Sequence, residues 1–339
     1  MVCKIGGNRR RRVETLCQLL LIRRVFNVLL VAFALVSCID KRTDKASQYS
    51  SLFKVSDDVI QTYSVEGNEL SVIEKKEYKR VIVLATPLSI FFSLLQGENN
   101  VVGILNKSRV SSGMKRIESV GEEGKIDIEK IISLQPDLII CNTYQAEEIK
   151  GVKVKKLLVD EYLEVSPKKR ITFSYMIGSL IGKESEGRTL AIKAALSKYK
   201  YKKLGVSVCK IDNFGGTWFE PGCDAYISRL ILGAGADFKC VENSEKSEKI
   251  SDEKVTVELA NSDYLLFLDW AKGKKGYKDR LNFVWEFNNY PKKIIYCNTL
   301  KSKYFEQSMV GSSDLISDLH NVIQFNRKGK FFEILELEK

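Results

Sequence analysis

The sequence contains a single histidine, His320, and lacks several short motifs that carry enzyme chemistry. It has no Gly-x-x-x-x-Gly-Lys-Ser/Thr loop, so nucleotide hydrolysis by this chain is not expected. No Cys-x-x-Cys pair occurs, which argues against a zinc or iron–sulfur site. His320 falls on the apolar face of an expected helix over 312–322, where a structural role outweighs a catalytic one. Since no motif marks a nucleophile and a base, we predict a protein that is not an enzyme and holds no metal or cofactor of its own.

The net charge of +11 does not indicate nucleic-acid binding, because much of it lies in one segment. Residues 1–37 hold seven basic side chains and one acidic side chain, which leaves 47 basic against 42 acidic residues in the rest of the chain. The chain beyond residue 37 is therefore only mildly basic.

Residues 1–37 have the order of a signal peptide: a basic segment, an apolar run over 25–36, a small residue and then Cys38. The run of about 12 residues is too short to span a bilayer. The ending Leu-Val-Ser-Cys resembles a bacterial lipoprotein cleavage box, with Cys38 as the acylated residue; the alternative is an uncleaved anchor or a chance cysteine. We expect the mature protein to be lipid-anchored to a bacterial membrane, facing the periplasm or the cell surface, on a flexible tether over 38–52.

Five cysteines remain beyond Cys38, an odd number with wide spacing. Cys141 and Cys209 follow apolar runs and are interpreted as small core residues. Cys223 and Cys240 lie in one expected domain and could pair, but without geometry that question stays open.

The stretch 80–142 predicts a parallel sheet with helical crossovers. Short apolar runs without alternation, at 81–85, 101–105 and 137–141, are typical of strands buried on both faces. Helical spacing separates them at 88–95 and 126–134. Ligands of such sheets bind beyond the carboxyl ends of the strands. Thr86, Pro87, Asn106 and the segment 142–144 are therefore expected at one functional edge.

The segments RVIVLATP, VVGILN and IDIEKIISLQPDLII resemble the first lobe of the substrate-binding proteins of ABC importers for iron chelates, haem and vitamin B12, the helical-backbone class III. The resemblance runs from about residue 80 to about 323. It implies an α/β fold of two Rossmann-like lobes with mainly parallel sheets, joined by a long interdomain helix, with a ligand cleft between them. We expect a β-hairpin over 53–78, a first lobe over 79–165, connecting helices over 166–203 and a second lobe over 204–325.

The candidate ligand contacts come from both lobes. In the first they follow strand ends, although Thr86 can equally be a helix cap. In the second they are aromatic residues, which suit a large, partly planar ligand but more often belong to a core. Trp218 and Phe219 lie in a Gly/Pro-rich stretch, 213–222, that resembles a cleft loop of the family. The candidates are Thr86, Pro87, Asn142, Thr143, Tyr144, Trp218, Phe219, Trp270 and Tyr304.

Two acidic residues, Glu129 and Glu253, match the positions from which this family docks onto its permease, with Glu258 as a rival to Glu253. Taken alone, each is simply an acid at a helix start, where the helix dipole favours it. The resemblance implies a monomeric receptor that captures a metal chelate (a corrinoid such as cobalamin, a ferric siderophore or haem) and delivers it to a permease whose ATPase is another chain. The alternative is a lipoprotein of the same fold used for scavenging, storage or partner binding.

Overall fold

The computed structural model describes residues 49–339 except 196, 241–242, 270–280, 282–283, 285–286, 288–289, 292 and 337–339. Cys38, Trp270 and the signal segment lie outside these residues. Everything described belongs to one compact unit, Tyr49–Lys339. Among the described residues no helix is both long enough and apolar enough to cross a membrane.

The first lobe is built on a five-stranded parallel sheet in the order β10-β9-β4-β5-β6. The three strands predicted in this lobe are confirmed as β4, β5 and β9, and both predicted helices are confirmed as α2 and α3. The elements are β4 (Val81–Val83), α2 (Ser89–Leu94), β5 (Val101–Ile104), β6 (Glu118–Ser119), α3 (Ile128–Ser133), β9 (Leu138–Cys141), α4 (Thr143–Glu148) and β10 (Lys156–Leu158). A small antiparallel ribbon, β7 (Gly121–Glu122) with β8 (Lys125–Ile126), precedes α3.

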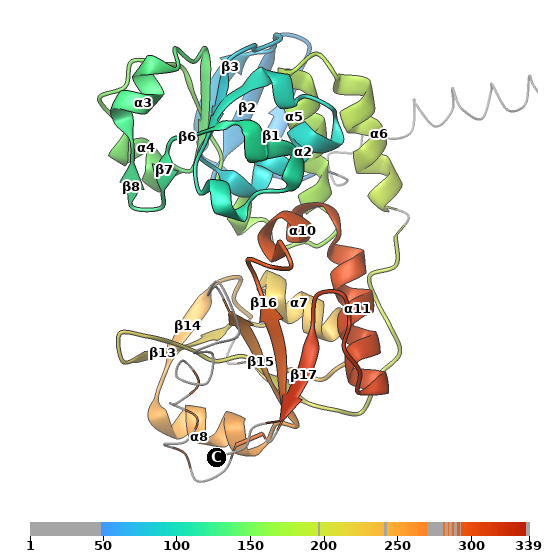
Figure 1. Ribbon diagram of the computed structural model, residues 1–339. Helices are drawn as coiled ribbons and strands as arrows, with labels where there is room; N and C mark the ends of the chain where they lie inside the picture. Colours follow the sequence, from blue (N-terminus) through green and yellow to red (C-terminus); the bar gives the residue numbers. More distant parts are fainter. Residues whose placement is uncertain are drawn as a thin grey trace, which may run out of the picture. The chain divides into compact units, whose positions relative to one another are not determined.

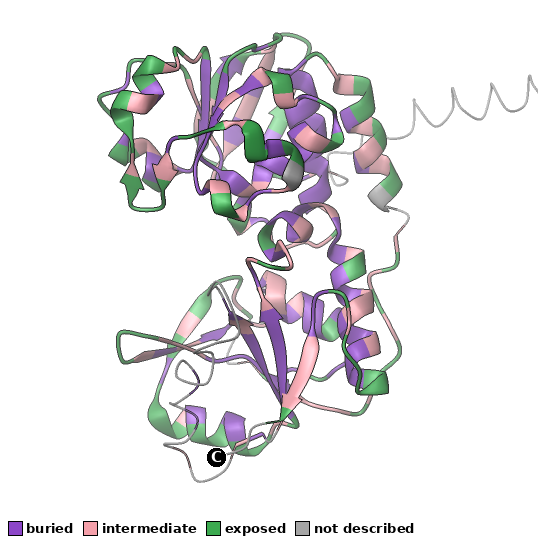
Figure 2. Ribbon diagram, in the orientation of Figure 1, coloured by how far each residue is buried: buried purple, intermediate pink, exposed green. Residues whose placement is uncertain are grey.

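The sheet is buried on both faces, as its uninterrupted apolar strands predicted. Val81 and Val83 of β4 join a core that includes residues of α2, whereas Ile82 and Leu84 join a core that includes Ile131 of α3. Figure 2 shows these central strands in the buried colour. Because successive side chains of a strand point to opposite faces, each core takes alternate residues.

An antiparallel sheet precedes the first lobe. The predicted hairpin is present as β2 (Val59–Tyr63) and β3 (Glu69–Glu74), and β1 (Phe53–Val55) adds a third strand. Gly67 has a φ of +86°, which glycine adopts without strain, and it lies in the turn between β2 and β3. Ile60 and Ile73 are buried in the same core as α2, so this sheet packs onto the first lobe.

The connection after residue 166 is helical, as expected, but it is divided rather than one long helix. It contains two short helices, α5 (Phe173–Leu180) and α6 (Glu184–Ala195), which fold back on each other. Gly182, with a φ of +71°, makes the break between them. A Cβ at Gly187 would overlap the carbonyl oxygen of Ser174, so the close packing of the two helices requires glycine there. Figure 1 shows the pair side by side on the first lobe.

The second lobe has a four-stranded sheet in the order β11-β15-β16-β17, in which only β17 is antiparallel. A separate antiparallel sheet, β12-β13-β14, replaces the loop expected over 213–222. The four-stranded sheet also extends beyond residue 325, the expected end of the lobe, because β17 pairs with β16. The elements are β11 (Val208–Cys209), β12 (Asp212–Phe214), β13 (Thr217–Pro221), α7 (Tyr226–Gly233), β14 (Ser247–Ile250), α8 (Asp252–Ala260), β15 (Tyr264–Asp269), β16 (Lys293–Asn298), α10 (Tyr304–Val310), α11 (Ser312–Phe325) and β17 (Glu333–Glu336).

Helix α10 follows a strand of the second lobe but packs against α2 of the first (Figure 1). Its Met309 is buried in the core of the first lobe. The Lys303 ammonium group, just before the helix, donates to the backbone oxygen of Ser108 at 2.9 Å. Residues of α10 are therefore in a position to complete a pocket that begins in the first lobe.

Candidate ligand-binding site

A pocket of about 340 Å³ lies at the carboxyl ends of the first lobe's strands. The ends of β4, β5 and β9 supply most of its floor, and α10 supplies two residues from the second lobe. This is the edge at which parallel sheets bind ligands. The lining residues are Leu84, Thr86, Pro87, Asn106, Arg109, Glu123, Asn142, Tyr144, Gln145, Glu161, Tyr162, Phe305 and Glu306.

The floor of the pocket is a hydrogen-bonded network around Asn142. The Asn142 side-chain amide donates to Glu161 Oε2 at 2.6 Å, and the Asn142 backbone N–H donates to Gln145 Oε1 at 2.9 Å. Gln145 in turn donates to the backbone oxygen of Leu84 at 3.2 Å. Burial raises the pKa of Glu161 to about 7, against hydrogen bonds from Asn142 and the backbone that lower it. The floor is thus rigid, and its amide groups are already paired.

One wall is formed around Glu123. The Asn106 side-chain amide donates to Glu123 Oε2 at 3.0 Å, and the Glu123 backbone N–H donates back to Asn106 Oδ1 at 2.8 Å. Asn106 has a φ of +52°, a left-handed conformation that asparagine tolerates better than most residues. Burial and then the charge of Glu123 raise the pKa of Tyr144, so its hydroxyl stays protonated.

Three aromatic side chains stand half-exposed at the pocket: Tyr144, Tyr162 and Phe305 are 47%, 48% and 45% exposed. The Tyr144 and Tyr162 rings meet edge to face, with their centroids 6.3 Å apart. Exposed aromatic rings at a concave site offer flat apolar surface to a ligand at low entropic cost. The arrangement is therefore suited to a ligand with a planar or apolar face.

Glu306 closes the pocket from the second lobe. Its Oε1 accepts hydrogen bonds from the Ser89 hydroxyl at 3.2 Å and from the Ser111 backbone at 2.9 Å. Its Oε2 is buried without a hydrogen-bond partner among the described residues, and burial raises the pKa of this carboxyl group. Glu306 therefore ties α10 to the first lobe at the edge of the pocket.

Four predicted contacts, Thr86, Pro87, Asn142 and Tyr144, come together in this pocket. Thr143 lies beside it, with its backbone and hydroxyl bound to the Asp160 carboxylate. Its predicted contact with a ligand stays a prediction, as do the binding roles of the other four.

The predicted aromatic contacts of the second lobe lie elsewhere. Trp218 is buried in the core with Val255, and its indole N–H donates to Asp252 at 2.7 Å. Phe219 is half-buried on β13, with its ring centroid 6.0 Å from that of Phe214. Tyr304 is buried in the core of the second lobe. Trp218, Phe219 and Tyr304 do not line the pocket. Phe305, which follows Tyr304 in the chain, does line it.

Sequence reasoning missed the lining residues Leu84, Arg109, Glu123, Gln145, Glu161, Tyr162, Phe305 and Glu306. A signal existed for two of them. The apolar residues of β10 are followed by Glu161 and Tyr162, just as β9 is followed by Asn142. Recognising that strand would have placed both residues at the same edge of the sheet.

The two expected docking residues occupy equivalent places. Glu129 and Glu253 are exposed, and each lies two positions after the residue that caps its helix. In both helices the cap side chain accepts a backbone N–H, from Lys130 in α3 and from Lys254 in α8. Each carboxylate therefore projects from a well-anchored first turn.

Comparison with known proteins shows the fold. No protein-family model matches the chain, and no curated protein matches it either. Solved structures do match. A periplasmic haem-binding protein from Pseudomonas aeruginosa is 14% identical, with a TM-score of 0.58 over 77% of this chain and 99% of that one. The petrobactin-binding protein YclQ from Bacillus subtilis is 18% identical, with a TM-score of 0.56 over 78% of this chain and 98% of that one.

The periplasmic vitamin B12-binding protein BtuF of Vibrio cholerae is 13% identical, with a TM-score of 0.51 over 73% of this chain and 97% of that one. At such identities the likeness is one of fold. The chain therefore has the two-lobed α/β fold of the class III periplasmic solute-binding proteins, as the sequence resemblance implied.

Proposed function

We propose that this protein is the substrate-binding lipoprotein of an ABC importer, which captures a metal chelate outside the cytoplasm and delivers it to a membrane permease. The chelate is a corrinoid such as cobalamin, a ferric siderophore or haem, the ligands named for solved structures of this fold. The observation that carries the proposal is the pocket at the strand ends with its three half-exposed aromatic side chains. A planar chelate can stack there while α10 holds it from the second lobe.

The pocket volume of about 340 Å³ suits one face or arm of such a ligand. Arg109 adds a cation at the wall, while Glu123 and Glu161 are already hydrogen-bonded to asparagine side chains. The hydrogen-bonded polar side chains thus hold the walls in place, and the aromatic rings supply the surface that contacts the ligand.

The test is calorimetric titration of the protein with cyanocobalamin, hemin and ferric petrobactin. We expect one of the three to bind at 1:1 with a Kd in the micromolar range or tighter, and Tyr144→Ala to weaken that complex. Failure of all three to bind, or binding that Tyr144→Ala leaves unchanged, would contradict the proposed site.

The importer role rests on Glu129 and Glu253. Each is accompanied on its helix face by an exposed apolar side chain, Ile132 at 58% and Val257 at 51% exposure. An exposed carboxylate beside an apolar side chain is suited to a contact that combines an ion pair with apolar burial.

Glu129→Lys and Glu253→Lys should reduce chelate uptake in vesicles carrying the permease and its ATPase, with ligand affinity unchanged. Glu186→Lys, an exposed charge reversal on α6, is the matched control.

The anchor rests on Cys38. In a bacterial host, the protein should fractionate with membranes and incorporate labelled palmitate, and Cys38→Ser should abolish both. An unlabelled protein with Cys38 intact would argue against the lipoprotein form while leaving the binding role in place.

A further inference from the structure

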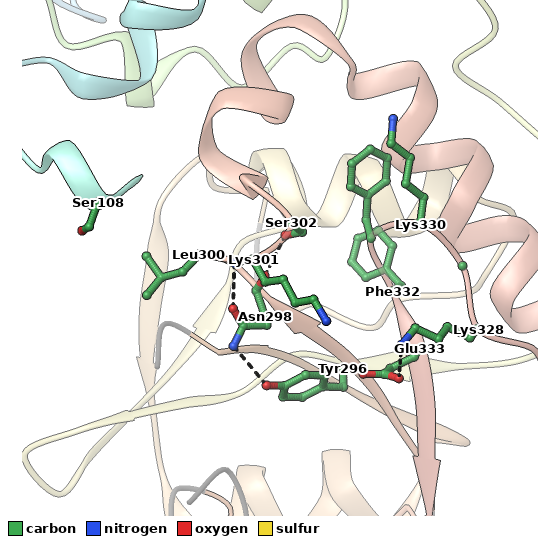
Figure 3. Close-up of a pocket in the computed structure, with 12 residues that line it drawn as sticks. Ser108, Tyr296, Asn298, Leu300, Lys301, Ser302, Lys328, Lys330, Phe332 and Glu333 are labelled. Carbon is green, nitrogen blue, oxygen red and sulfur yellow. Dashed lines mark hydrogen bonds and ion pairs between the residues drawn. The ribbon is translucent and has the colours of Figure 1, made fainter. Parts of the chain in front are cut away.

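A second pocket, of about 650 Å³, lies in the second lobe where β16 ends and β17 begins (Figure 3). It shares no lining residue with the pocket at the first lobe's strand ends. Its lining comes from the link between β16 and α10, the loop before β17, and Ser108 of the first lobe. The lining residues are Ser108, Tyr296, Asn298, Leu300, Lys301, Ser302, Lys328, Gly329, Lys330, Phe331, Phe332 and Glu333.

The loop before β17 is held in one shape by Asp318 of α11. The Asp318 carboxylate accepts backbone N–H groups from Lys330 at 2.8 Å, Phe331 at 2.8 Å and Phe332 at 3.0 Å. A Cβ at Gly329 would overlap Asp318, so the close approach needs glycine. Because the loop is fixed, the lysines on either side of Gly329 have defined positions at the pocket.

The charge of the lining is predominantly positive. Lys301, Lys328 and Lys330 line the pocket together with one carboxylate, Glu333, which lies 3.4 Å from Lys328. Neither Lys301 nor Lys330 forms an ion pair within the described part of the chain. Figure 3 shows the Lys301 and Lys328 side chains extending toward each other across the pocket. The Lys303 ammonium group, bound to the Ser108 backbone oxygen, adds a further positive charge nearby.

The polar amide in the wall is engaged within the protein. Asn298 Oδ1 accepts the Lys301 backbone N–H at 2.8 Å, and its side-chain amide donates to the Tyr296 hydroxyl at 3.3 Å. Leu300 and the largely buried Phe331 and Phe332 add apolar lining, beside Ser108 and Ser302. Ammonium groups over an apolar wall favour a ligand that has both a negative charge and an apolar body.

We propose that this pocket binds a small organic anion: a carboxylate or phosphate group, held by Lys301 and Lys328, on an aromatic or aliphatic body that lies against Leu300 and the phenylalanine rings. The site is distinct from the proposed chelate pocket, and its occupancy does not require the transport role. Two ammonium groups that are only partly desolvated should make binding strongly dependent on ionic strength.

The test uses anilinonaphthalene sulfonate, an aromatic anion whose fluorescence reports binding, and phenylnaphthylamine, the same ring system without the sulfonate. In the full chain, the double variant Lys301→Ala/Lys328→Ala should weaken binding of the sulfonate about ten-fold or more and change binding of the neutral dye less than about two-fold. The control variant Lys54→Ala/Lys249→Ala also removes two positive charges, at exposed strand positions. It should leave the affinity for both dyes unchanged. Equal sulfonate affinities of the two double variants would overturn the proposal.

A second readout locates the dye. Acetylation of the wild-type protein with and without saturating sulfonate, followed by mass spectrometry, should show protection of Lys301 and Lys328 but not of Lys54. Protection of other lysines without these two would overturn the site. Phe305→Ala, which alters only the first-lobe pocket, should leave sulfonate binding intact; loss of binding in that variant would place the dye there and contradict the proposal.

Discussion

The guanidinium carbon of Arg170 lies 3.7 Å from the centroid of the Tyr226 ring, so a residue just before α5 stacks on the first turn of α7. The same guanidinium donates to the backbone oxygen of Glu164 at 2.7 Å, to Ser308 of α10 at 3.1 Å and to the backbone oxygen of Tyr162 at 3.2 Å. One buried cation thus joins α7, α10 and the segment that carries a pocket aromatic side chain.

We therefore expect Arg170→Lys to be destabilising although it keeps the charge. Lysine cannot reproduce the planar fork that reaches these three acceptors while stacking on a ring. The free energy of unfolding, from urea titration, should fall by about 1–3 kcal/mol. Arg229→Lys is the control, because that side chain is partly exposed and, among the described residues, pairs only with Asp224, just before the same helix. Equal losses in the two variants would show that the Arg170 contacts add nothing specific.

The aromatic side chains of the first pocket are expected to supply much of its affinity. Tyr162→Ala and Phe305→Ala each remove a half-exposed ring and should weaken chelate binding by about 1–1.5 kcal/mol, roughly a ten-fold rise in Kd. Calorimetry with the chelate that binds the wild-type protein measures this. Phe325→Ala removes a ring of similar exposure at the end of α11 and should leave Kd unchanged. An equal effect at Phe325 would mean that the losses are not local to the pocket.

The first-lobe side of the pocket at the strand ends can be predicted from local sequence, whereas the side that α10 supplies cannot. Apolar runs without alternation predicted β4 and β9, and parallel topology then placed Thr86 and Asn142 at one edge. Phe305 and Glu306 reach that edge only because α10 packs across from the second lobe, a tertiary contact that no sequence period encodes.

Trp218 is a residue that the sequence predicted at the ligand site and that the structure places in the core. The family resemblance implied a cleft loop around it, but the segment forms the β12–β13 hairpin, in which Trp218 lies opposite Asn213, and Trp218 also pairs with Ile250 of β14. Strand register decides which face a side chain takes, and here it turns the indole into the core. Composition indicated a loop over 213–222 and could not give the strands or their register.

Cys223 and Cys240, whose pairing the sequence left open, form a disulfide that spans α7, with their Cα atoms 5.2 Å apart. Closing a loop of this length restricts the unfolded chain, and its reduction should lower the free energy of unfolding by about 3 kcal/mol. Urea unfolding with and without a reducing agent measures the change, and Cys223→Ser/Cys240→Ser should match the reduced protein. Cys209→Ser, at a buried free thiol, is the control that should leave sensitivity to reductant in place. Unfolding that is indifferent to reductant would contradict a stabilising role.

Glu220 of β13 should make stability fall as the pH rises toward neutrality. Both of its carboxyl oxygens are buried without a hydrogen-bond partner among the described residues. Burial, and then the charge of Glu258, raise its pKa to about 7, while Lys254 opposes the shift. The folded state therefore holds this proton more tightly than the unfolded chain, whose glutamates titrate near 4.3. The stabilisation is complete below about pH 4 and is lost as the pH rises through about 7.

Glu220→Gln keeps the shape of the protonated side chain and removes the titration, so it should flatten the fall in unfolding free energy between about pH 4.5 and 7. At pH 8 it should raise stability by up to roughly 3 kcal/mol. Burial also raises the pKa of Glu161, to about 7, and that of Glu306, and both contribute with the same sign, so Glu220→Gln should remove only part of the wild-type slope. Glu118→Gln is the control: the Lys130 ammonium lowers the pKa of that exposed carboxylate, which puts its titration below this window. A Glu220→Gln protein that keeps the full wild-type slope would show that the carboxyl group ionises freely in the folded state.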